Sequence, residues 1–244
     1  MSNVAKNKQI ATMFKYDQAE RIFENVKLVV EENNSRSILD IGAGLLSTAF
    51  AISGLVERYL AVEIDAQRVK NLEDAGLGVV QGDFPNVETK DSFDCVLSSH
   101  SIPERSDDIQ RDYSDFLHGA WELVADKGVF HIITFKGSKM ENDLIREELC
   151  DEPFAVDPKF EIMMNIIKIL TAHVKTSQFS SFLISDSAEK IAEESWRGVF
   201  KSVAEYKNHA EDFLDIIKKR YRDGEGLYKM PTQHLALTAF KVQN

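Results

Sequence analysis

The chain has 244 residues, a formal net charge of −11, and 43% hydrophobic residues. This length and apolar content suit one large domain or two small ones with a full core. The acidic balance disfavours a nucleic-acid partner, because proteins that bind RNA or DNA neutralise phosphates with clustered Lys and Arg. We see no apolar run long enough to cross a bilayer and no signal-peptide core at the start. Cys95 and Cys150 provide no disulfide framework. We therefore expect a cytoplasmic protein with reduced thiols and no membrane partner.

Helices and strands alternate over the first half of the chain. Apolar residues at helical spacing predict a helix from Asp17 to Glu32, within an N-terminal helical segment covering residues 1–34. The alternation that follows predicts a parallel sheet with helices on both faces. The expected strands are 37–41, 59–64, 78–81, 93–98 and 129–135, and the expected helices between them begin near 45, 66 and 113.

The second half departs from this alternation. It predicts helices at 142–150 and 160–170, a strand at 171–184 and a closing strand at 234–242. Roughly fifty residues separate those last two strands, which is far more than a hairpin loop needs. We therefore expect an α/β fold with a doubly wound, mostly parallel, seven-stranded sheet and a helical insertion between the last two strands. Residues 35–184 and 229–244 would form the core, and 185–228 the insertion.

Two helical segments are expected inside the insertion, at 187–196 and 210–221. Asp186 followed by Glu189 fits a helix-start signal for the first of them. Aromatic residues recur through the insertion, and they either bury it on the sheet or line a substrate lid. They are Trp196, Phe200, Tyr206, Phe213 and Tyr221.

The segment Ile38–Gly44 reads as a strand ending in an acid and a glycine turn, where backbone amides can meet a nucleotide-like ligand. Glu63 ends the next strand with an acid, which suits a ribose. The dinucleotide fingerprint needs Gly or Ala at position 47, where this chain has Ser47. That fingerprint also includes no acidic residue two positions before its first glycine, where this chain has Asp40. Asp40 can instead hold an ammonium group. The order of these residues favours S-adenosylmethionine over NAD.

Two further strand ends support this cofactor. Gln81 is followed by Gly82, Asp83 and Phe84, where the carboxylate can accept a hydrogen bond from an adenine amino group and the ring can pack on the base. The strand Phe93–Ser98 ends in a polar residue and is followed by further polar residues. With these four strand ends in order, residues 37–135 resemble the class I S-adenosylmethionine-dependent methyltransferases. Leu46 departs from the pattern, since many members carry a third glycine there.

The resemblance implies a role for each of these positions. The backbone of Gly42, Ala43 and Gly44 would approach the methionine portion, with Asp40 behind it, and Glu63 would take the ribose hydroxyls. Taken singly, Asp40 also reads as a turn cap and Glu63 as a solvated strand end. The resemblance further implies adenine contacts, a path to the methyl group and a closing tyrosine, and it implies no metal. These remaining cofactor residues are Ile64, Gly82, Asp83, Phe84, Ser98, Ser99 and Tyr16.

His100 follows directly on the strand expected to face the methyl donor. An imidazole is well matched to accept a proton near neutral pH, so His100 is the expected catalytic acid or base. An equally good interpretation is a histidine that hydrogen-bonds a loop carbonyl.

The methyl acceptor is open to three interpretations. The chain also looks like the adenine-N6 dimethyltransferases of ribosomal RNA, but those enzymes need an Asn-(Leu/Ile)-Pro-Tyr motif where this chain has 98–103, Ser-Ser-His-Ser-Ile-Pro. An oxygen or nitrogen of a small molecule is therefore favoured. The alternatives are an RNA base methyltransferase and an inactive cofactor-binding partner subunit. A homodimer is compatible with the sequence.

Overall fold

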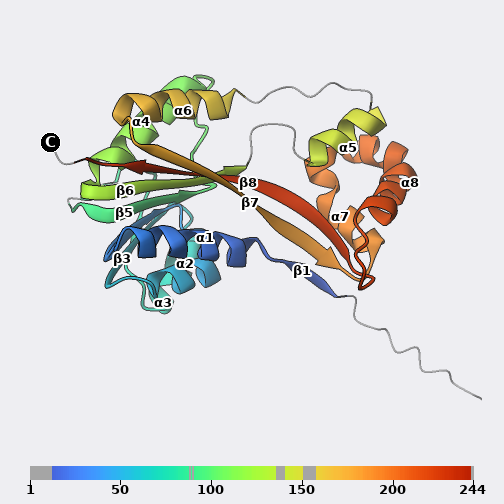
Figure 1. The fold of residues 1–244 in the computed structure, drawn as a ribbon, viewed down its shortest axis with the longest axis horizontal. Helices are drawn as coiled ribbons and strands as arrows, with labels where there is room; N and C mark the ends of the chain where they lie inside the picture. Colours follow the sequence, from blue (N-terminus) through green and yellow to red (C-terminus); the bar gives the residue numbers. More distant parts are fainter. Residues whose placement is uncertain (1–12, 88, 90, 136–140, 151–157, 243–244) are drawn as a thin grey trace, which may run out of the picture. The chain divides into compact units, whose positions relative to one another are not determined.

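A computed structural model describes residues 13–87, 89, 91–135, 141–150 and 158–242 (Figure 1). The chain divides into two compact units, and the strands β7 (Val174–Ser185) and β8 (Tyr228–Phe240) contribute residues to both. The larger unit takes its described residues from 18–140, 155–181 and 233–244, and the smaller unit from 1–17, 141–154 and 182–232.

The strands of the described chain form one mixed sheet of eight. The remaining six strands are β1 Phe14–Tyr16, β2 Ser37–Ile41, β3 Arg58–Glu63, β4 Val79–Gln81, β5 Phe93–Ser99 and β6 Val124–Phe135. Their order across the sheet is β1-β7-β8-β6-β5-β2-β3-β4. The expected number of seven was therefore wrong by one strand. The extra strand, β1, has three residues and pairs antiparallel with β7, and so short an edge segment carries no periodic signal.

The expected parallel arrangement is confirmed for β2 to β6. Strands β2, β3 and β4 pair in parallel on one side, and β5 and β6 pair in parallel on the other side of β2. The direction of strand addition thus reverses between β2 and β5. In open α/β sheets, ligands bind at such a switch point, outside the carboxyl ends of the strands. Strand β8 runs antiparallel to β6.

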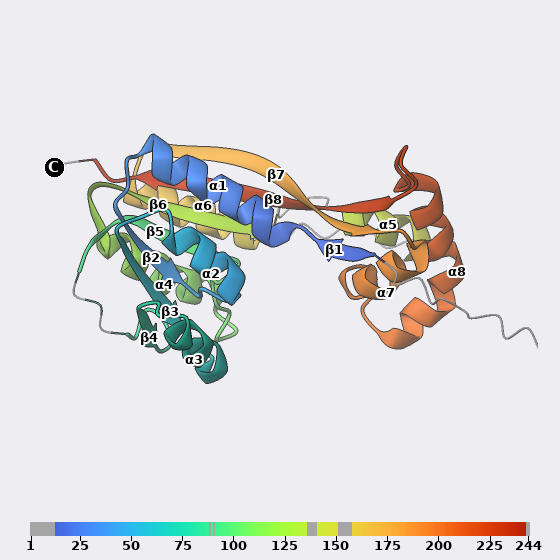
Figure 2. The same cartoon turned by 90° about the horizontal axis from the view of Figure 1, so that it is seen from below.

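Helices cover both faces of the larger unit's sheet (Figure 2). One face carries α4 (Ile109–Glu122) and α6 (Lys159–Leu170), whose apolar residues share a core with β2, β5, β6 and β8. The other face carries α1 (Gln18–Glu32), α2 (Leu46–Ser53) and α3 (Ala66–Asp74).

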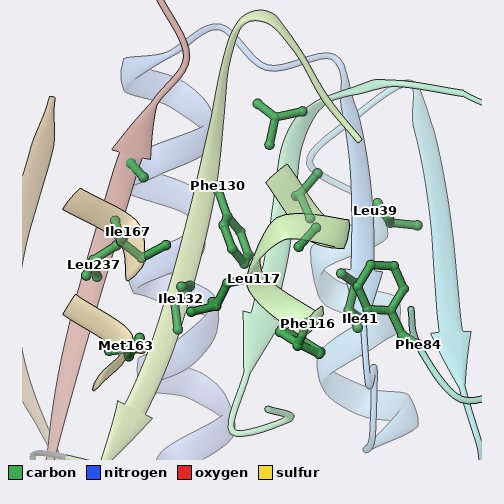
Figure 3. Close-up of a cluster of buried hydrophobic side chains, with 14 of the residues drawn as sticks. Leu39, Ile41, Phe84, Phe116, Leu117, Phe130, Ile132, Met163, Ile167 and Leu237 are labelled. Carbon is green, nitrogen blue, oxygen red and sulfur yellow. The ribbon is translucent and has the colours of Figure 1, made fainter. Parts of the chain in front are cut away.

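Alternation along β2 explains the two cores. Leu39 and Ile41 are buried on the α4 side, whereas Ile38 is buried on the α1 side, since successive side chains of a strand point to opposite faces. Figure 3 shows the α4-side core, in which Phe116 and Phe130 are fully buried between the sheet and the helices. Both cores hold the parallel strands in place beneath the switch point.

The smaller unit contains three helices among its described residues, α5 (Glu141–Cys150), α7 (Ala188–Val199) and α8 (Val203–Arg220). Its aromatic residues pack mainly on each other. Phe200 meets Phe213 edge to face at 5.3 Å, and Trp196 stacks on Tyr206 at 5.3 Å. This unit therefore has an apolar core of its own.

Several expected boundaries were wrong. The Ser187 hydroxyl accepts the Lys190 N–H and caps α7, in place of the expected Asp186. Helix α8 begins seven positions before the expected residue 210, because Ser202 caps it and accepts the Glu205 N–H. Strand β8 begins at Tyr228 rather than 234, and its residues before 234 do not alternate strictly between buried and exposed positions, so hydrophobic patterning does not mark its start.

Candidate functional site

The turn after β2 is built around two glycines in the left-handed region. Gly42 has φ of 71° and Gly44 has φ of 63°, which side chains other than glycine adopt only under strain. The Gly42 N–H donates to the Val62 carbonyl, with N and O 2.7 Å apart. A Cβ at Gly42 would lie 2.4 Å from the Ser101 Cβ. The loop after β5 therefore lies directly against the glycine turn at the switch point.

Glu63, at the end of β3, is only 3% exposed and bonds this turn. Its Oε2 accepts the Gly44 N–H at 3.0 Å, and its Oε1 accepts the Asp65 N–H at 3.0 Å. Arg68 Nη1 lies 3.8 Å from Oε2. Glu63 is thus no solvated strand end. Each carboxylate oxygen keeps a further acceptor site, which two neighbouring hydroxyls can use.

Asp40 lies inside the sheet rather than at its surface. Its Oδ2 accepts a hydrogen bond from the Tyr59 hydroxyl at 2.7 Å. Burial raises the pKa of Asp40 to about 6, the Tyr59 hydrogen bond lowers that pKa, and the nearby charge of Glu63 raises it. A carboxyl with this pKa changes its charge just below neutral pH.

Asp83 accepts hydrogen bonds from a residue that the sequence did not predict as part of the site. Arg105, in the loop after β5, donates from Nε to Asp83 Oδ2 at 2.7 Å and from Nη2 to Oδ1 at 2.5 Å. Nη2 also donates to the Phe84 carbonyl. Asp112 fixes this loop by accepting the Arg105 N–H at 2.6 Å and the Ser106 N–H at 2.7 Å. The carboxylate expected to meet an adenine thus carries a bidentate partner from the chain itself.

The residues beside Asp83 are closely packed. Phe84 is 5% exposed, and its ring meets Phe116 edge to face at 5.3 Å (Figure 3). A Cβ at Gly82 would lie 2.2 Å from Val87 Cγ1, so the chain turns tightly there. Ile64, in contrast, is 63% exposed directly after Glu63 and offers an apolar surface. Stacking of Phe84 on an adenine ring stays a prediction.

Polar residues at the end of β5 and just after it form hydrogen bonds that lead back to β2. The Ser98 hydroxyl is buried and lies 2.9 Å from the Ser101 hydroxyl, which donates to the Ile41 carbonyl at 2.5 Å. Ser99 is half-buried. Tyr16, in β1, belongs to the smaller unit and pairs with Leu183 of β7. Its expected contact with a cofactor stays a prediction.

His100 adopts an unusual backbone conformation, with φ of 54°. Its backbone N–H donates to the Ile133 carbonyl at 2.8 Å, and its ring Nε2 lies 3.2 Å from Nδ1 of His234 in β8. The ring's partner is therefore a second histidine, in place of the loop carbonyl considered from the sequence. Burial, and then the neighbouring His234, lower the pKa of His100 to about 4. At neutral pH the imidazole is uncharged and has a lone pair to offer.

A recess lies beside Phe84 and Arg105. A hollow of about 630 Å³ lies between the loop after β4 and helix α4, and its lining includes Pro85, Arg105, Arg111, Asp115 and His118. Across the described ranges, no group of three or more His, Cys, Asp or Glu side chains is arranged to hold a metal ion. No helix in that part of the chain combines the length and apolar character of a membrane span.

No protein-family model and no curated protein sequence matches this chain. Solved structures do match it. YcgJ from Bacillus subtilis shares 15% identity over 91% of this chain and 99% of its own, with a TM-score of 0.57. The N-methyltransferase NodS from Bradyrhizobium japonicum, in complex with S-adenosyl-L-homocysteine, shares 7% over 92% and 87%, with a TM-score of 0.52. The plantazolicin methyltransferase BpumL, also with that product, shares 12% over 93% and 86%, with a TM-score of 0.51.

The chain has the fold of the class I S-adenosylmethionine-dependent methyltransferases. In this methyltransferase fold, the structure brings part of the expected set together at the switch point. Asp40, the 42–44 turn and Glu63 are joined by hydrogen bonds or direct succession, and the loop that follows Ser98 lies against the turn. Asp83 lies at the end of the next strand, held by Arg105.

Three residues that bond members of the expected site were missed by sequence reasoning. Tyr59 bonds Asp40, Arg105 bonds Asp83, and His234 bonds His100. Tyr59 stands nineteen positions from Asp40 and His234 stands 134 positions from His100, so no local pattern links the partners. The strand register, which brings β2 beside β3 and β8 beside β6, creates the contacts of Tyr59 and His234. Arg105 reaches Asp83 from the loop after β5.

Proposed function

We propose that this chain is an S-adenosylmethionine-dependent methyltransferase that transfers a methyl group to an oxygen or nitrogen of a small molecule. The observation that carries the proposal is the buried Glu63 carboxylate, which accepts the Gly44 N–H of the glycine turn at 3.0 Å. This couples an acceptor for ribose hydroxyls to a turn whose backbone a ligand can approach closely.

The residues present fit the cofactor. Apart from the Gly42 carbonyl oxygen at 3.6 Å, the position of a Cβ on Gly44 has open space, which leaves room for a ligand at the turn. Glu63 would take the ribose hydroxyls and Ile64 would supply apolar surface, while ionised Asp40 would attract the methionine ammonium. When bound, the sulfonium supplies an activated methyl group for an in-line displacement.

The chain's own residues supply orientation and a proton acceptor. The loop after β5 is fixed against the glycine turn through Ser101, so the acceptor molecule would be held beside the methyl donor. His100 follows in the same loop as an uncharged imidazole and would accept the proton that an attacking hydroxyl or amine loses.

The net negative charge of the chain and its lack of the adenine-N6 signature both support a small-molecule acceptor. The net charge of −11 gives little attraction for nucleic-acid phosphates. Residues 98–103 lack the Asn-Pro-Tyr signature of the adenine-N6 enzymes. The matching structures include proteins described as an N-methyltransferase and a plantazolicin methyltransferase, both with the demethylated cofactor.

The test is calorimetric titration with S-adenosylmethionine. We expect the wild-type protein to bind and Glu63→Ala to lose at least about tenfold in affinity, because two hydroxyls lose a charged acceptor. Glu57→Ala is the matched control, since Glu57 precedes the other end of β3 and pairs on the surface with Arg36. A folded wild-type protein that binds no S-adenosylmethionine would rule the proposal out.

Turnover is tested with a donor carrying a labelled methyl group and a panel of alcohols, phenols and amines. We expect label in at least one acceptor. Binding of the donor without transfer to any member of the panel would favour the inactive partner subunit.

A further inference from the structure

His100 and His234 belong to a buried row of hydrogen-bonded side chains. Nε2 of His100 lies 3.2 Å from Nδ1 of His234, and Nε2 of His234 lies 2.7 Å from the Ser181 hydroxyl oxygen. Ser181 and His234 are fully buried. The row runs from β7 through β8 to the loop after β5, and all three residues lie in the larger unit.

Aromatic side chains restrain both imidazole rings. The His100 ring centroid lies 4.2 Å from that of Phe135, and the His234 ring stacks on Phe179 at 4.8 Å with an interplanar angle of 18°. Neither ring can turn over without disturbing this packing. The nitrogen of each ring that faces its neighbour is therefore fixed.

One end of the row has no partner. Nδ1 of His100 is buried and makes no hydrogen bond with any residue that the structure describes. A neutral imidazole has one N–H donor and one acceptor nitrogen, and a buried N–H without an acceptor is rarer than an under-used acceptor. Nδ1 is therefore the acceptor, and Nε2 carries the hydrogen and donates it to His234.

We propose that His234 is a positioning residue that holds His100 in its Nε2–H form and so leaves Nδ1 of His100, which the acceptor molecule must uncover as it binds, as the proton acceptor of methyl transfer. This inference rests on the proposed function. His100 Nδ1 takes the proton of the attacking O–H or N–H as that oxygen or nitrogen bonds the methyl carbon, and the electron pair of the broken C–S bond stays on sulfur. The imidazolium thus formed keeps its Nε2–H bond to His234.

Two matched variants separate positioning from packing. His234→Asn keeps an amide group where Nδ1 stood, next to His100, and loses the Ser181 bond. His234→Gln keeps a group where Nε2 stood, next to Ser181, and loses the His100 bond. Both replace the ring by a polar side chain, so any effect of lost ring packing appears in both.

The first readout is the tautomer of His100, measured by nitrogen-15 NMR of the histidine-labelled full chain and assigned with a His100→Ala variant. We expect hydrogen on Nε2 in the wild type and in His234→Asn, and a tautomer mixture in His234→Gln. Hydrogen on Nδ1 in the wild type would overturn the inference without need of any variant.

The second readout is methyl transfer to whichever panel member accepts it. We expect kcat of His234→Gln to fall by about tenfold or more and that of His234→Asn to stay within about threefold, with S-adenosylmethionine affinity unchanged in both. Equal losses of kcat in the two variants would contradict positioning and leave the proposed function standing. A wild type that binds no S-adenosylmethionine would overturn both.

Discussion

A buried carboxylate binds a cationic group best when it is ionised, and Asp40 lies close to the pH at which that condition fails. Burial raises its pKa to about 6, whereas the hydrogen bond from Tyr59 opposes the rise. Binding of an ammonium group favours the ionised form. The affinity for S-adenosylmethionine is therefore expected to hold above pH 7 and to fall as the pH drops through 6.

Removing the Tyr59 hydroxyl moves this transition. Tyr59→Phe deletes the bond that lowers the pKa of Asp40, so the loss of affinity is expected to begin at a higher pH than in the wild type. Calorimetric titrations with S-adenosylmethionine from pH 8 to pH 5 measure the midpoint. Tyr206→Phe, in the smaller unit, is the control and leaves it unchanged. An unshifted midpoint in Tyr59→Phe would separate Asp40 from cofactor binding.

Arg105 competes for the carboxylate that an adenine amino group would need. Its two hydrogen bonds to Asp83 must loosen or be shared before Asp83 can accept another donor. Arg105→Ala is therefore expected to raise the affinity for S-adenosylmethionine about threefold to tenfold, measured by calorimetry.

Arg111→Ala serves as the control, because Arg111 is an exposed arginine of the neighbouring helix that pairs with Asp115 at 3.8 Å. An affinity that falls in Arg105→Ala but not in Arg111→Ala would show that Arg105 itself supports the cofactor site.

At the scale of elements, the helices of the smaller unit depend on one aromatic core. Phe213 of α8 is fully buried and meets Phe200 edge to face at 5.3 Å. Phe213→Ala is expected to destabilise the smaller unit by about 3–5 kcal/mol, since the cavity left behind adds to the lost transfer free energy.

The two tryptophans allow this loss to be assigned. Trp196 lies in the smaller unit and Trp121 in the larger, so denaturation followed by fluorescence in a Trp121→Phe background reports the smaller unit. Val203→Ala, at a half-exposed position of the same helix, is the control and changes stability little. An equal shift followed through Trp121, in a Trp196→Phe background, would mean that the two units unfold together.

Elements with strong periodicity were predictable from sequence, and their caps and short strands were not. Strand β2 and helix α1 fall within one residue of expectation, because buried positions recur at the period of each structure. Ser187 and Asp186 are both good cap residues, and only the backbone geometry selects Ser187. The three residues of β1 are exposed throughout and show no pattern.

Of the expected site, only the residues at the carboxyl ends of the strands were predictable from the sequence. Asp40, the 42–44 turn and Glu63 meet because parallel strands bring their carboxyl ends to one edge. The partners of Asp40, Asp83 and His100 were not predictable, since those contacts depend on register and on loop conformation. The hydrogen-bond partners lie far apart in the sequence and meet only when the strands pair, so local sequence analysis does not identify them.

At the scale of the whole molecule, a buried histidine makes the larger unit sensitive to acid. His131 bonds Thr238 at 3.0 Å and Asn25 at 2.9 Å, and burial lowers its pKa from 6.5 to about 4. Between these values the unfolded chain binds a proton that the folded chain does not. Stability is therefore lost as the pH falls from about 6.5 toward 4, by about 3 kcal/mol for this group.

His131→Gln removes this titration and keeps an N–H for Asn25. The difference in unfolding free energy between the wild type and this variant is expected to shift by about 3 kcal/mol, in favour of the variant, from pH 7 to pH 4. Denaturation followed through Trp121 in a Trp196→Phe background isolates the larger unit. If the difference in unfolding free energy stays constant with pH, His131 binds its proton equally well in the folded and the unfolded chain.

The shared strands β7 and β8 also determine when the two units can fold during synthesis. Each unit draws on stretches far apart in the chain, and β8 lies between β7 and β6 in the sheet. A chain growing on the ribosome can therefore complete neither unit until residues 228–240 have emerged. Until then β6 keeps an open apolar edge, which is the kind of edge that chaperones must shield from other nascent chains.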